Sequence, residues 1–405
     1  MIPFSPPHIH QDILDEVVAA LKSGWITTGP RTKQFEKDLS AYCGNPATIC
    51  LNSATAGLEI MLRWFGVGPG DEVILPAYTY AATANVVMHC GARPVLVDVN
   101  PDDFNINPEA IRQKLSERTK VIMPVDFGGF PCDYDAINHL VAEPEVKRLF
   151  RPNSKNQEKL GRILVLADAA HSIGAQMNGK RSGALTDVSV FSFHAVKNLT
   201  TAEGGAVALN LPEPFDNQEV YQYLCIATLH GQNKDALSKL QKGNWKYDII
   251  EPGYKCNMTD IMAAIGLVEL RRYESEILAK RRQITEWYSD LFRAHSWARI
   301  PISSDKRRKS SWHLYPLRIQ GIDEATRDKI IQEIFALDVS VNVHFMPLPL
   351  LSFYKGAGYR IEDYPISYSN YASEITLPLY EELTPELVEI IANAVIASVQ
   401  KIRTA

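Results

Sequence analysis

The 405-residue sequence lacks several features that would decide its class at once. No apolar run approaches the ~20 residues that a membrane-spanning helix needs. There is no long run of basic or acidic residues, and the formal net charge is only −5, which argues against nucleic acid or an anionic membrane as the main partner. The short basic cluster at residues 306–309 is interpreted as a solvated loop.

Cysteine is also scarce and carries no metal-binding pattern. The six cysteines are scattered, without CxxC pairs or metal-ligand spacing. Cysteines scattered in this way are typical of free thiols in a reducing compartment, so we predict no metal site. The first residues show no basic region followed by an apolar core, and we therefore expect a cytoplasmic protein.

What the chain does have is enough length and apolar content, 46% of its residues, for two domains. We expect a large domain over residues 1–270, including a proline-rich N-terminal arm, and a small α+β domain over 271–405. Between residues 71 and 140, short apolar runs alternate with helical patterns, which indicates βαβ units and a mainly parallel sheet flanked by helices. Further predicted elements are a helix at Asn217–Gln241, a surface insertion at Glu143–Arg162, a connecting helix at Arg271–Trp297, and strands at Trp312–Ile319 and Val339–His344.

The stretch Ile163–Leu209 concentrates polar residues after two apolar runs that are typical of buried strands. Open α/β sheets bind ligands at the carboxyl ends of their strands. A lysine held there can lose solvent and become a nucleophilic amine. The polar residues that follow the two runs are Asp168, His171, Ser192, His194 and Lys197.

Two earlier segments fit the same edge of the sheet. Small residues from Asn52 to Gly57 open a predicted helix, where free N–H groups can bind an anion, although the segment taken alone favours a plain cap by Ser53 or Thr55. Ala77–Ala81 offers two tyrosines that could stack on a planar ligand or simply pack. Pyridoxal phosphate needs this whole set: phosphate donors, a carboxylate for its ring nitrogen and a lysine for its aldehyde.

The motifs around these residues resemble the DegT/DnrJ/EryC1/StrS family of sugar aminotransferases, which are fold type I pyridoxal-phosphate (PLP) enzymes. Asp168 and Lys197 stand 197 − 168 = 29 positions apart, each inside its own motif. The matching motifs are GWITTGP at Gly24, NSATAGLE at Asn52, PGDEVILPAYTYAATANVV at Pro69, ADAAHSIGA at Ala167, SFHAVKNLTTAEGG at Ser192 and GYKCNMTDIMAAIGLVEL at Gly253.

The resemblance implies a role for each matching position. Lys197 would bind the cofactor covalently and move protons, Asp168 would pair with the ring nitrogen, and His171 would lie near the ring oxygen. A homodimer with a shared site is implied, because a neighbouring subunit would supply a phosphate contact from Asn257 or Lys255. The remaining cofactor contacts would be Tyr80 for stacking and Ala54, Thr55 and Ser192 for the phosphate.

The reaction implied is transfer of an amino group from an amino acid, glutamate by resemblance, to a nucleotide-linked keto sugar. Position C4 and a role in polysaccharide or glycolipid biosynthesis are favoured by analogy. The alternatives are a sugar dehydratase, an enzyme acting on a keto cyclitol, and a non-catalytic sensor on the same scaffold. His194 is either packing or catalytic, and His344 either structural or sugar-binding. The loop VNVHFMPLP departs from the family pattern at Phe345 and Pro349.

Overall fold

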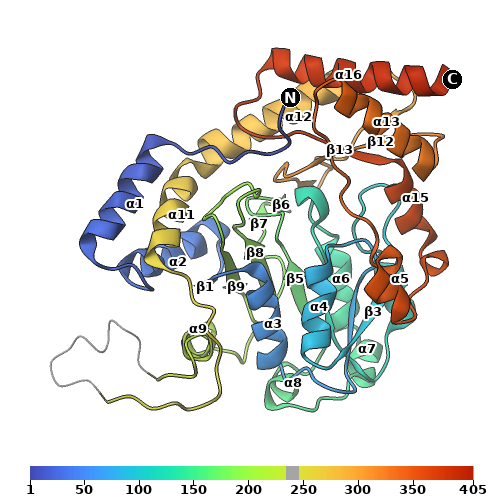
Figure 1. The fold of residues 1–405 in the computed structure, drawn as a ribbon. Helices are drawn as coiled ribbons and strands as arrows, with labels where there is room; N and C mark the ends of the chain where they lie inside the picture. Colours follow the sequence, from blue (N-terminus) through green and yellow to red (C-terminus); the bar gives the residue numbers. More distant parts are fainter. Residues whose placement is uncertain (234–245, 405) are drawn as a thin grey trace.

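The structure, a computed structural model, describes residues 1–233 and 246–404. A seven-stranded sheet forms its centre, in the order β1-β9-β8-β5-β4-β2-β3 (Figure 1). Neighbouring strands are parallel from β8 to β3, whereas β9 runs antiparallel to both β1 and β8. The predicted α/β fold with a mainly parallel sheet is therefore confirmed. The strands are β1 (Ala47–Leu51), β2 (Glu72–Pro76), β3 (Arg93–Val97), β4 (Thr119–Ile122), β5 (Leu164–Asp168), β8 (Val188–Ser192) and β9 (Gly205–Leu209).

Helices cover both faces of this sheet, which explains why its strands are apolar runs rather than alternating patterns. Every residue of β1, β2, β5 and β9 is buried. On one face, Phe35 and Leu267 belong to the same buried cluster as Phe191 of β8. The helices of this part are α1 (Gln11–Ser23), α2 (Pro30–Cys43), α3 (Ala54–Trp64), α4 (Ala81–His89), α5 (Pro108–Lys114), α6 (Tyr134–Ala142), α9 (Asn217–Ala227) and α11 (Asp260–Arg272).

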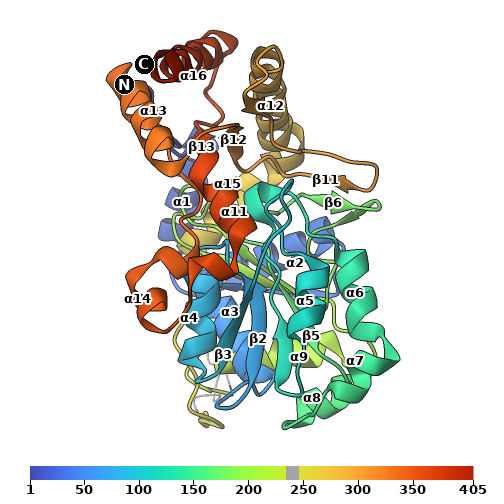
Figure 2. The same ribbon diagram turned by 90° about the vertical axis from the view of Figure 1, so that its right-hand side faces the viewer.

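Most of the C-terminal part lies above the large sheet in Figure 1 and has a core of its own, whereas Leu348 and Tyr354 pack in the core of the large sheet. A small antiparallel sheet of β10 (Ala298–Arg299), β12 (Tyr315–Ile319) and β13 (Glu374–Leu377) packs with several helices. The predicted domain boundary after residue 270 falls near the end of α11 and stays a prediction. The helices of this part are α12 (Ala279–Phe292), α13 (Glu324–Ala336), α14 (Ser352–Gly356), α15 (Pro365–Ser373) and α16 (Pro385–Thr404), which Figure 2 shows from the side.

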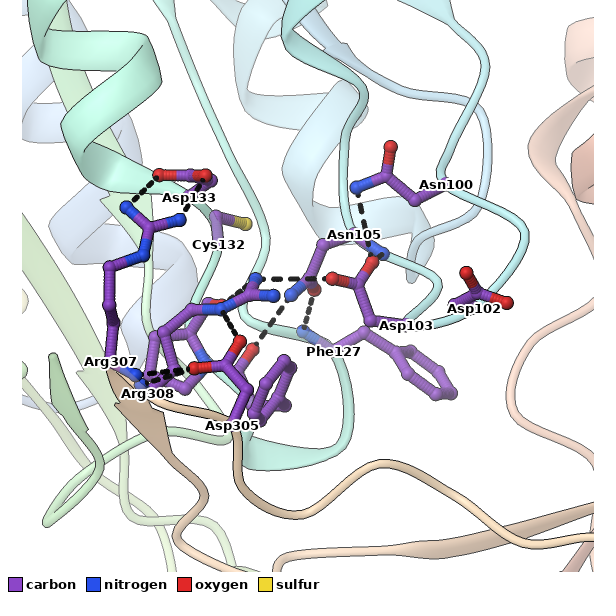
Figure 3. A network of polar contacts seen from close by, with 12 residues as sticks. Asn100, Asp102, Asp103, Asn105, Phe127, Cys132, Asp133, Asp305, Arg307 and Arg308 are labelled. Atoms are coloured by element: carbon purple, nitrogen blue, oxygen red, sulfur yellow. Dashed lines mark hydrogen bonds and ion pairs between the residues drawn. The ribbon is translucent and has the colours of Figure 1, made fainter.

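A network of charged side chains joins the two parts (Figure 3). Arg308, in β11 (Arg308–Lys309), donates hydrogen bonds to Asp103 at 3.1 Å and to Asp305 at 2.7 Å. β11 also pairs with β6 (Gln176–Met177), which pairs in turn with β7 (Lys180–Arg181). Arg307 pairs with Asp133 at 2.7 Å on the outside of the same network. The segment that follows is held by backbone hydrogen bonds, since the N–H groups of Ser311 and His313 donate to the carbonyls of Gly129 and Gly128.

One predicted strand is wrong, because its backbone bonds to two separate segments, and one predicted helix is present but shorter. Val339–His344 alternates like a strand, but it forms only isolated bridges, with Ile2 on one side and Thr376 on the other. The helix predicted at Arg271–Trp297 is interrupted by a π-helical turn, Tyr273–Leu278, and ends at Phe292.

Two other expectations need smaller corrections. The helix predicted at Asn217–Gln241 ends at Ala227, and positions 234–241 of that prediction lie outside the described residues. The Glu143–Arg162 insertion contains two short helices, α7 (Pro144–Leu149) and α8 (Lys155–Leu160). One of its polar residues attaches it to the end of α3, since Ser154 donates a 2.8 Å hydrogen bond to the Phe65 carbonyl. Across residues 1–233 and 246–404, the helices are too short or too polar to span a bilayer.

Candidate active site

The carboxyl ends of β1, β5 and β8 meet at one edge of the large sheet. β5 ends at Asp168 and its parallel neighbour β8 ends at Ser192. β1 is parallel to β8 across the antiparallel β9, since Leu51 and Ser192 both pair with Gly205. The segments that follow these strands therefore converge, as ligand-binding segments of open α/β sheets do.

A cavity of about 380 Å³ opens at this edge. Seven of the eight predicted site residues line it, and so do His194 and His344. Asn257 is the exception. The seven are Ala54, Thr55, Tyr80, Asp168, His171, Ser192 and Lys197.

The start of α3 provides an anion site beside Ser192. The helix begins at Ala54, within the run of small residues, and Ser53 caps it by accepting a hydrogen bond from the Ala56 N–H at 3.1 Å. The first N–H groups of a helix have no partner within it, so those of Ala54 and Thr55 remain available. A Cβ at Gly205 would overlap the Ser53–Ala54 backbone, which explains why a glycine stands there.

Asp168 is a buried carboxylate, 7% exposed, and its hydrogen-bond donors are neutral groups. It accepts a hydrogen bond from the Thr83 hydroxyl at 2.8 Å and one from the Ala170 N–H at 3.2 Å. Among the described residues it forms no ion pair. Burial raises its pKa, against the opposing effect of the Thr83 hydrogen bond. A buried carboxylate of this kind is suited to a cationic ligand group.

Lys197 lies in the turn that follows β8, with its amine in the cavity. Burial lowers the pKa of this lysine to about 8, although the nearby Asp168 carboxylate acts in the opposite direction. Its Nζ makes no hydrogen bond or ion pair to any described residue. An amine with this pKa is partly neutral near physiological pH, as a nucleophile or proton carrier must be.

The protonation of His171 follows from its hydrogen bond. The Gly128 N–H donates to His171 Nδ1 at 3.2 Å, so Nε2 carries the proton of the neutral ring. Burial and the positive charge of Lys197 lower the pKa of His171 well below its usual value, which keeps the ring neutral. His171 therefore offers one N–H donor to a ligand in the cavity.

Sequence reasoning missed a polar clamp beside Lys197. Asn198 donates to the Ser311 carbonyl at 2.7 Å, and its own side-chain oxygen pairs with His313 Nδ1 at 2.8 Å. The His313 ring lies 4.3 Å from that of His171, centroid to centroid. This clamp fixes the backbone after Lys197 against the C-terminal part. The only sequence signal for it is a histidine in an otherwise apolar run, Trp312–Tyr315.

The structure distinguishes the two candidate tyrosines by their burial. Tyr78 is fully buried, and its hydroxyl donates to the His344 carbonyl at 2.7 Å. Tyr80 is 65% exposed, lines the cavity and lies 5.9 Å from the Phe345 ring. Tyr80 is thus the tyrosine free to contact a ligand. His194 is also exposed, with its Nε2 3.7 Å from Glu203.

Lys255 and Asn257 lie away from the cavity of their own chain. Lys255 is exposed and donates to the Asn257 side-chain oxygen, while Asn257 donates to the Thr28 hydroxyl. Asn257 also forms a bridge with Leu51, at the end of β1. A contact from either side chain to a cofactor stays a prediction.

The residues of the cavity fit PLP. The free N–H groups of α3 and the Ser192 hydroxyl suit its phosphate. Asp168, buried without a cation, suits its protonated ring nitrogen, and the His171 N–H suits its ring oxygen. Lys197, with a lowered pKa, suits its aldehyde.

Comparison with known proteins agrees with this fit. The model of the DegT/DnrJ/EryC1/StrS aminotransferase family matches residues 7–150 and 155–396. The spore coat polysaccharide biosynthesis protein SpsC of Bacillus subtilis is 34% identical over 398 residues, which cover 97% of this chain and 96% of SpsC.

Solved structures are similar over the whole chain. Spr1654 of Streptococcus pneumoniae, assigned as a sugar aminotransferase, is 46% identical in its PMP form with a TM-score of 0.95, covering 99% of this chain and 100% of that one. The same protein has been solved in a PLP form. Helicobacter pylori PseC, an aminotransferase of pseudoaminic acid biosynthesis, is 25% identical with a TM-score of 0.85 and covers 99% of both chains.

Proposed function

We propose, from the premise that this chain belongs to the DegT/DnrJ/EryC1/StrS aminotransferase family, that it aminates C4 of a nucleotide-linked keto sugar with glutamate as amino donor. The protein is a PLP-dependent aminotransferase of a family that acts on sugars. The single observation that carries the proposal is the cavity that joins Asp168, His171 and Lys197. The products would serve polysaccharide or glycolipid biosynthesis, a proposal supported by the similarity to SpsC and PseC.

Lys197 is proposed as the residue that moves protons. With a pKa of about 8, its Nζ can release a proton and take one up again near neutral pH. Acid–base catalysis by a positioned side chain is typically worth ~10²–10⁴-fold. The Asn198–His313 clamp supports this role, because it fixes the backbone from which the amine projects.

The other cavity residues are proposed to bind and orient the cofactor. When bound, PLP supplies an electron sink for the carbon that exchanges its amine. Asp168, held by Thr83, would keep a proton on the ring nitrogen. His171 would donate its Nε2 proton to the ring oxygen, and Tyr80 would stack on the ring. Ala54, Thr55 and Ser192 would hold the phosphate.

A homodimer is proposed as the active unit, with Asn257 reaching the partner's cavity. Asn257 and Lys255 lie outside their own cavity, which supports a role toward a second subunit. The test is the mass of the purified protein in solution, followed by cofactor affinity in Asn257→Ala and Lys255→Ala. A monomer with full activity would overturn this proposal.

Cytoplasmic location stays a prediction. It is supported by six free thiols, most of them buried, which suit a reducing compartment.

The substrate proposal is tested by amination assays with glutamate and a panel of nucleotide-linked 3-keto and 4-keto sugars. We expect one class of 4-keto sugar to be converted in preference to the others. If no keto sugar is aminated while a keto acid or a keto cyclitol is, the sugar assignment falls. A dehydratase is disfavoured because Lys197 stands where such relatives are expected to carry histidine. A sensor is disfavoured by the complete set of Asp168, Ser192 and Lys197.

A further inference from the structure

The N-terminal arm, residues 1–10, is attached at two points, and the segment between them lines the cavity. Ile2 forms a parallel bridge with Val339. His8 Nδ1 lies 2.8 Å from a carboxylate oxygen of Glu382. α1 begins only at Gln11, so the arm is a non-helical segment held at two points on the C-terminal part.

The residues between these two points face the cavity. Phe4 and Ser5 both line it. The Phe4 ring stacks on the ring of His344, with centroids 5.7 Å apart and planes 22° apart. The Ser5 side chain is half-buried, and its hydroxyl makes no hydrogen bond to any described residue. A polar group on a cavity wall without an internal partner is available to a ligand.

Prolines stiffen this segment. Pro3, Pro6 and Pro7 flank the two cavity-facing residues, and each proline fixes its own φ near −65°. A proline-rich segment that is held at two points loses little entropy when it binds a ligand, because it is already ordered. The arm is therefore suited to present Phe4 and Ser5 at fixed positions.

The partner of Phe4 is held equally firmly. The His344 N–H donates to Glu374 at 3.0 Å, and its Nδ1 pairs with the Thr376 hydroxyl at 3.0 Å. Tyr78 binds its carbonyl, as described above. Phe4 and His344 thus form a single rigid wall, made from segments 340 positions apart in the sequence (344 − 4 = 340).

We infer that Phe4 and Ser5 are specificity-determining residues for the amino acceptor. Phe4 provides an apolar face for the acceptor, and the Ser5 hydroxyl hydrogen-bonds one of its hydroxyl groups. This inference rests on the proposed function. The wall lies on the C-terminal side of the cavity, whereas the residues proposed to hold the cofactor follow strands of the large sheet. A keto sugar joined to a nucleotide is much larger than an amino acid, so the acceptor extends to this wall and the donor does not.

The test separates the two half-reactions. Each variant is loaded with PLP, and its reaction with glutamate is followed by absorbance in the absence of acceptor. The acceptor half-reaction is then measured with the nucleotide-linked keto sugar that the wild type converts best. We expect Phe4→Ala to raise the acceptor KM roughly 10- to 100-fold and Ser5→Ala roughly 3- to 10-fold, with the glutamate reaction changed less than about twofold. Phe4→Trp, which keeps an aromatic face on His344, should restore most of the loss.

Two control variants isolate the wall from general effects. Ile9→Ala alters the same arm at an exposed side chain beyond the His8 attachment, and Phe353→Ala removes an exposed phenylalanine elsewhere. Both should behave as wild type. Amide hydrogen exchange provides a second measurement on the unmodified protein: the keto sugar should slow exchange of the Phe4 and Ser5 amides, and glutamate should not.

The outcomes distinguish this inference from the proposed function. Equal effects of Phe4→Ala on the glutamate and acceptor reactions, or no effect on either, would overturn the role of the arm and leave the proposed function standing. So would unchanged exchange in the arm with the keto sugar present. A wild-type protein that aminates no keto sugar would overturn the proposed function and, with it, the role of the arm.

Discussion

The two sides of the cavity are built in different ways. On the sheet side, Asp168 and Ser192 are the last residues of parallel neighbouring strands, and Lys197 follows within one turn. On the C-terminal side, Phe4 and His344 come from opposite ends of the chain and meet only because the N-terminal arm packs on the C-terminal part. The sheet side places chemical groups by local backbone geometry, whereas the other side depends on tertiary contacts.

This difference suggests a division of labour. Strand ends in a buried sheet cannot shift without breaking its ladder, so they suit groups that must be placed accurately for chemistry. Segments that are joined by a few side-chain contacts can change in sequence without disturbing the sheet. They suit the recognition of a substrate that differs among relatives.

The largest expected effect is on the sheet side. Lys197→Ala removes the amine proposed as proton carrier and covalent attachment point, and should lower kcat by at least ~10²–10⁴-fold. Borohydride reduction of the PLP-loaded wild type, followed by mass spectrometry, should find the cofactor fixed on Lys197. Lys180→Ala, at an exposed position, is the control and should retain activity. Cofactor fixed on any other lysine of the wild type would contradict the assignment.

The next effect concerns the charged network that joins the large-sheet part of the chain to the C-terminal part. Arg308 is 13% exposed and pairs with Asp103, which is 6% exposed, so Arg308→Ala leaves a buried carboxylate without its cation. We expect the free energy of unfolding to fall by roughly 2–4 kcal/mol.

Arg307 provides the matched control, because it belongs to the same segment but pairs at the surface, with a side chain 43% exposed. Arg307→Ala should cost less than about 1 kcal/mol. Chemical denaturation measures both variants, and equal losses would show that burial does not decide the strength of this junction.

The smallest effect is a shift in the pH dependence of the rate at which the cofactor-free protein binds PLP. Because burial lowers the pKa of Lys197 to about 8, the rate at which the cofactor-free protein binds PLP should rise with pH and level off just above pH 8. The Asp168 carboxylate raises that pKa, so Asp168→Asn should move the midpoint to lower pH.

Asp363→Asn, which changes an exposed carboxylate, should leave the midpoint of this profile in place. A wild-type rate that still climbs near pH 10 would show that Lys197 is not desolvated.

The sheet side could be predicted from sequence because its signals are local. Apolar runs that end at Asp168 and before Lys197 fix both the strands and the edge at which they end. The same reasoning left Tyr78 and Tyr80 undecided, and only the structure separates a buried hydroxyl from an exposed ring. The roles of His171 and Asn257 came from family resemblance rather than from any pattern in the residues.

The C-terminal side could not be predicted because no local pattern encodes its contacts. Val339 and Val341 alternate with polar residues as in a strand, yet the bridging partners of the segment are Ile2 and Thr376. Asn198 and His313 lie 115 positions apart, and the sequence around either residue does not predict their hydrogen bond. Phe4 and Ser5 belong to an arm that composition alone describes only as proline-rich.

The most direct test of this division of labour compares Asp168→Asn with Phe4→Ala. The dissociation constant for PLP and the KM for the keto sugar acceptor are measured for both variants and the wild type. We predict that Asp168→Asn weakens PLP binding by roughly 10-fold or more, and that Phe4→Ala raises the acceptor KM while the PLP dissociation constant stays within about twofold. Comparable weakening of PLP binding in both variants would contradict the account.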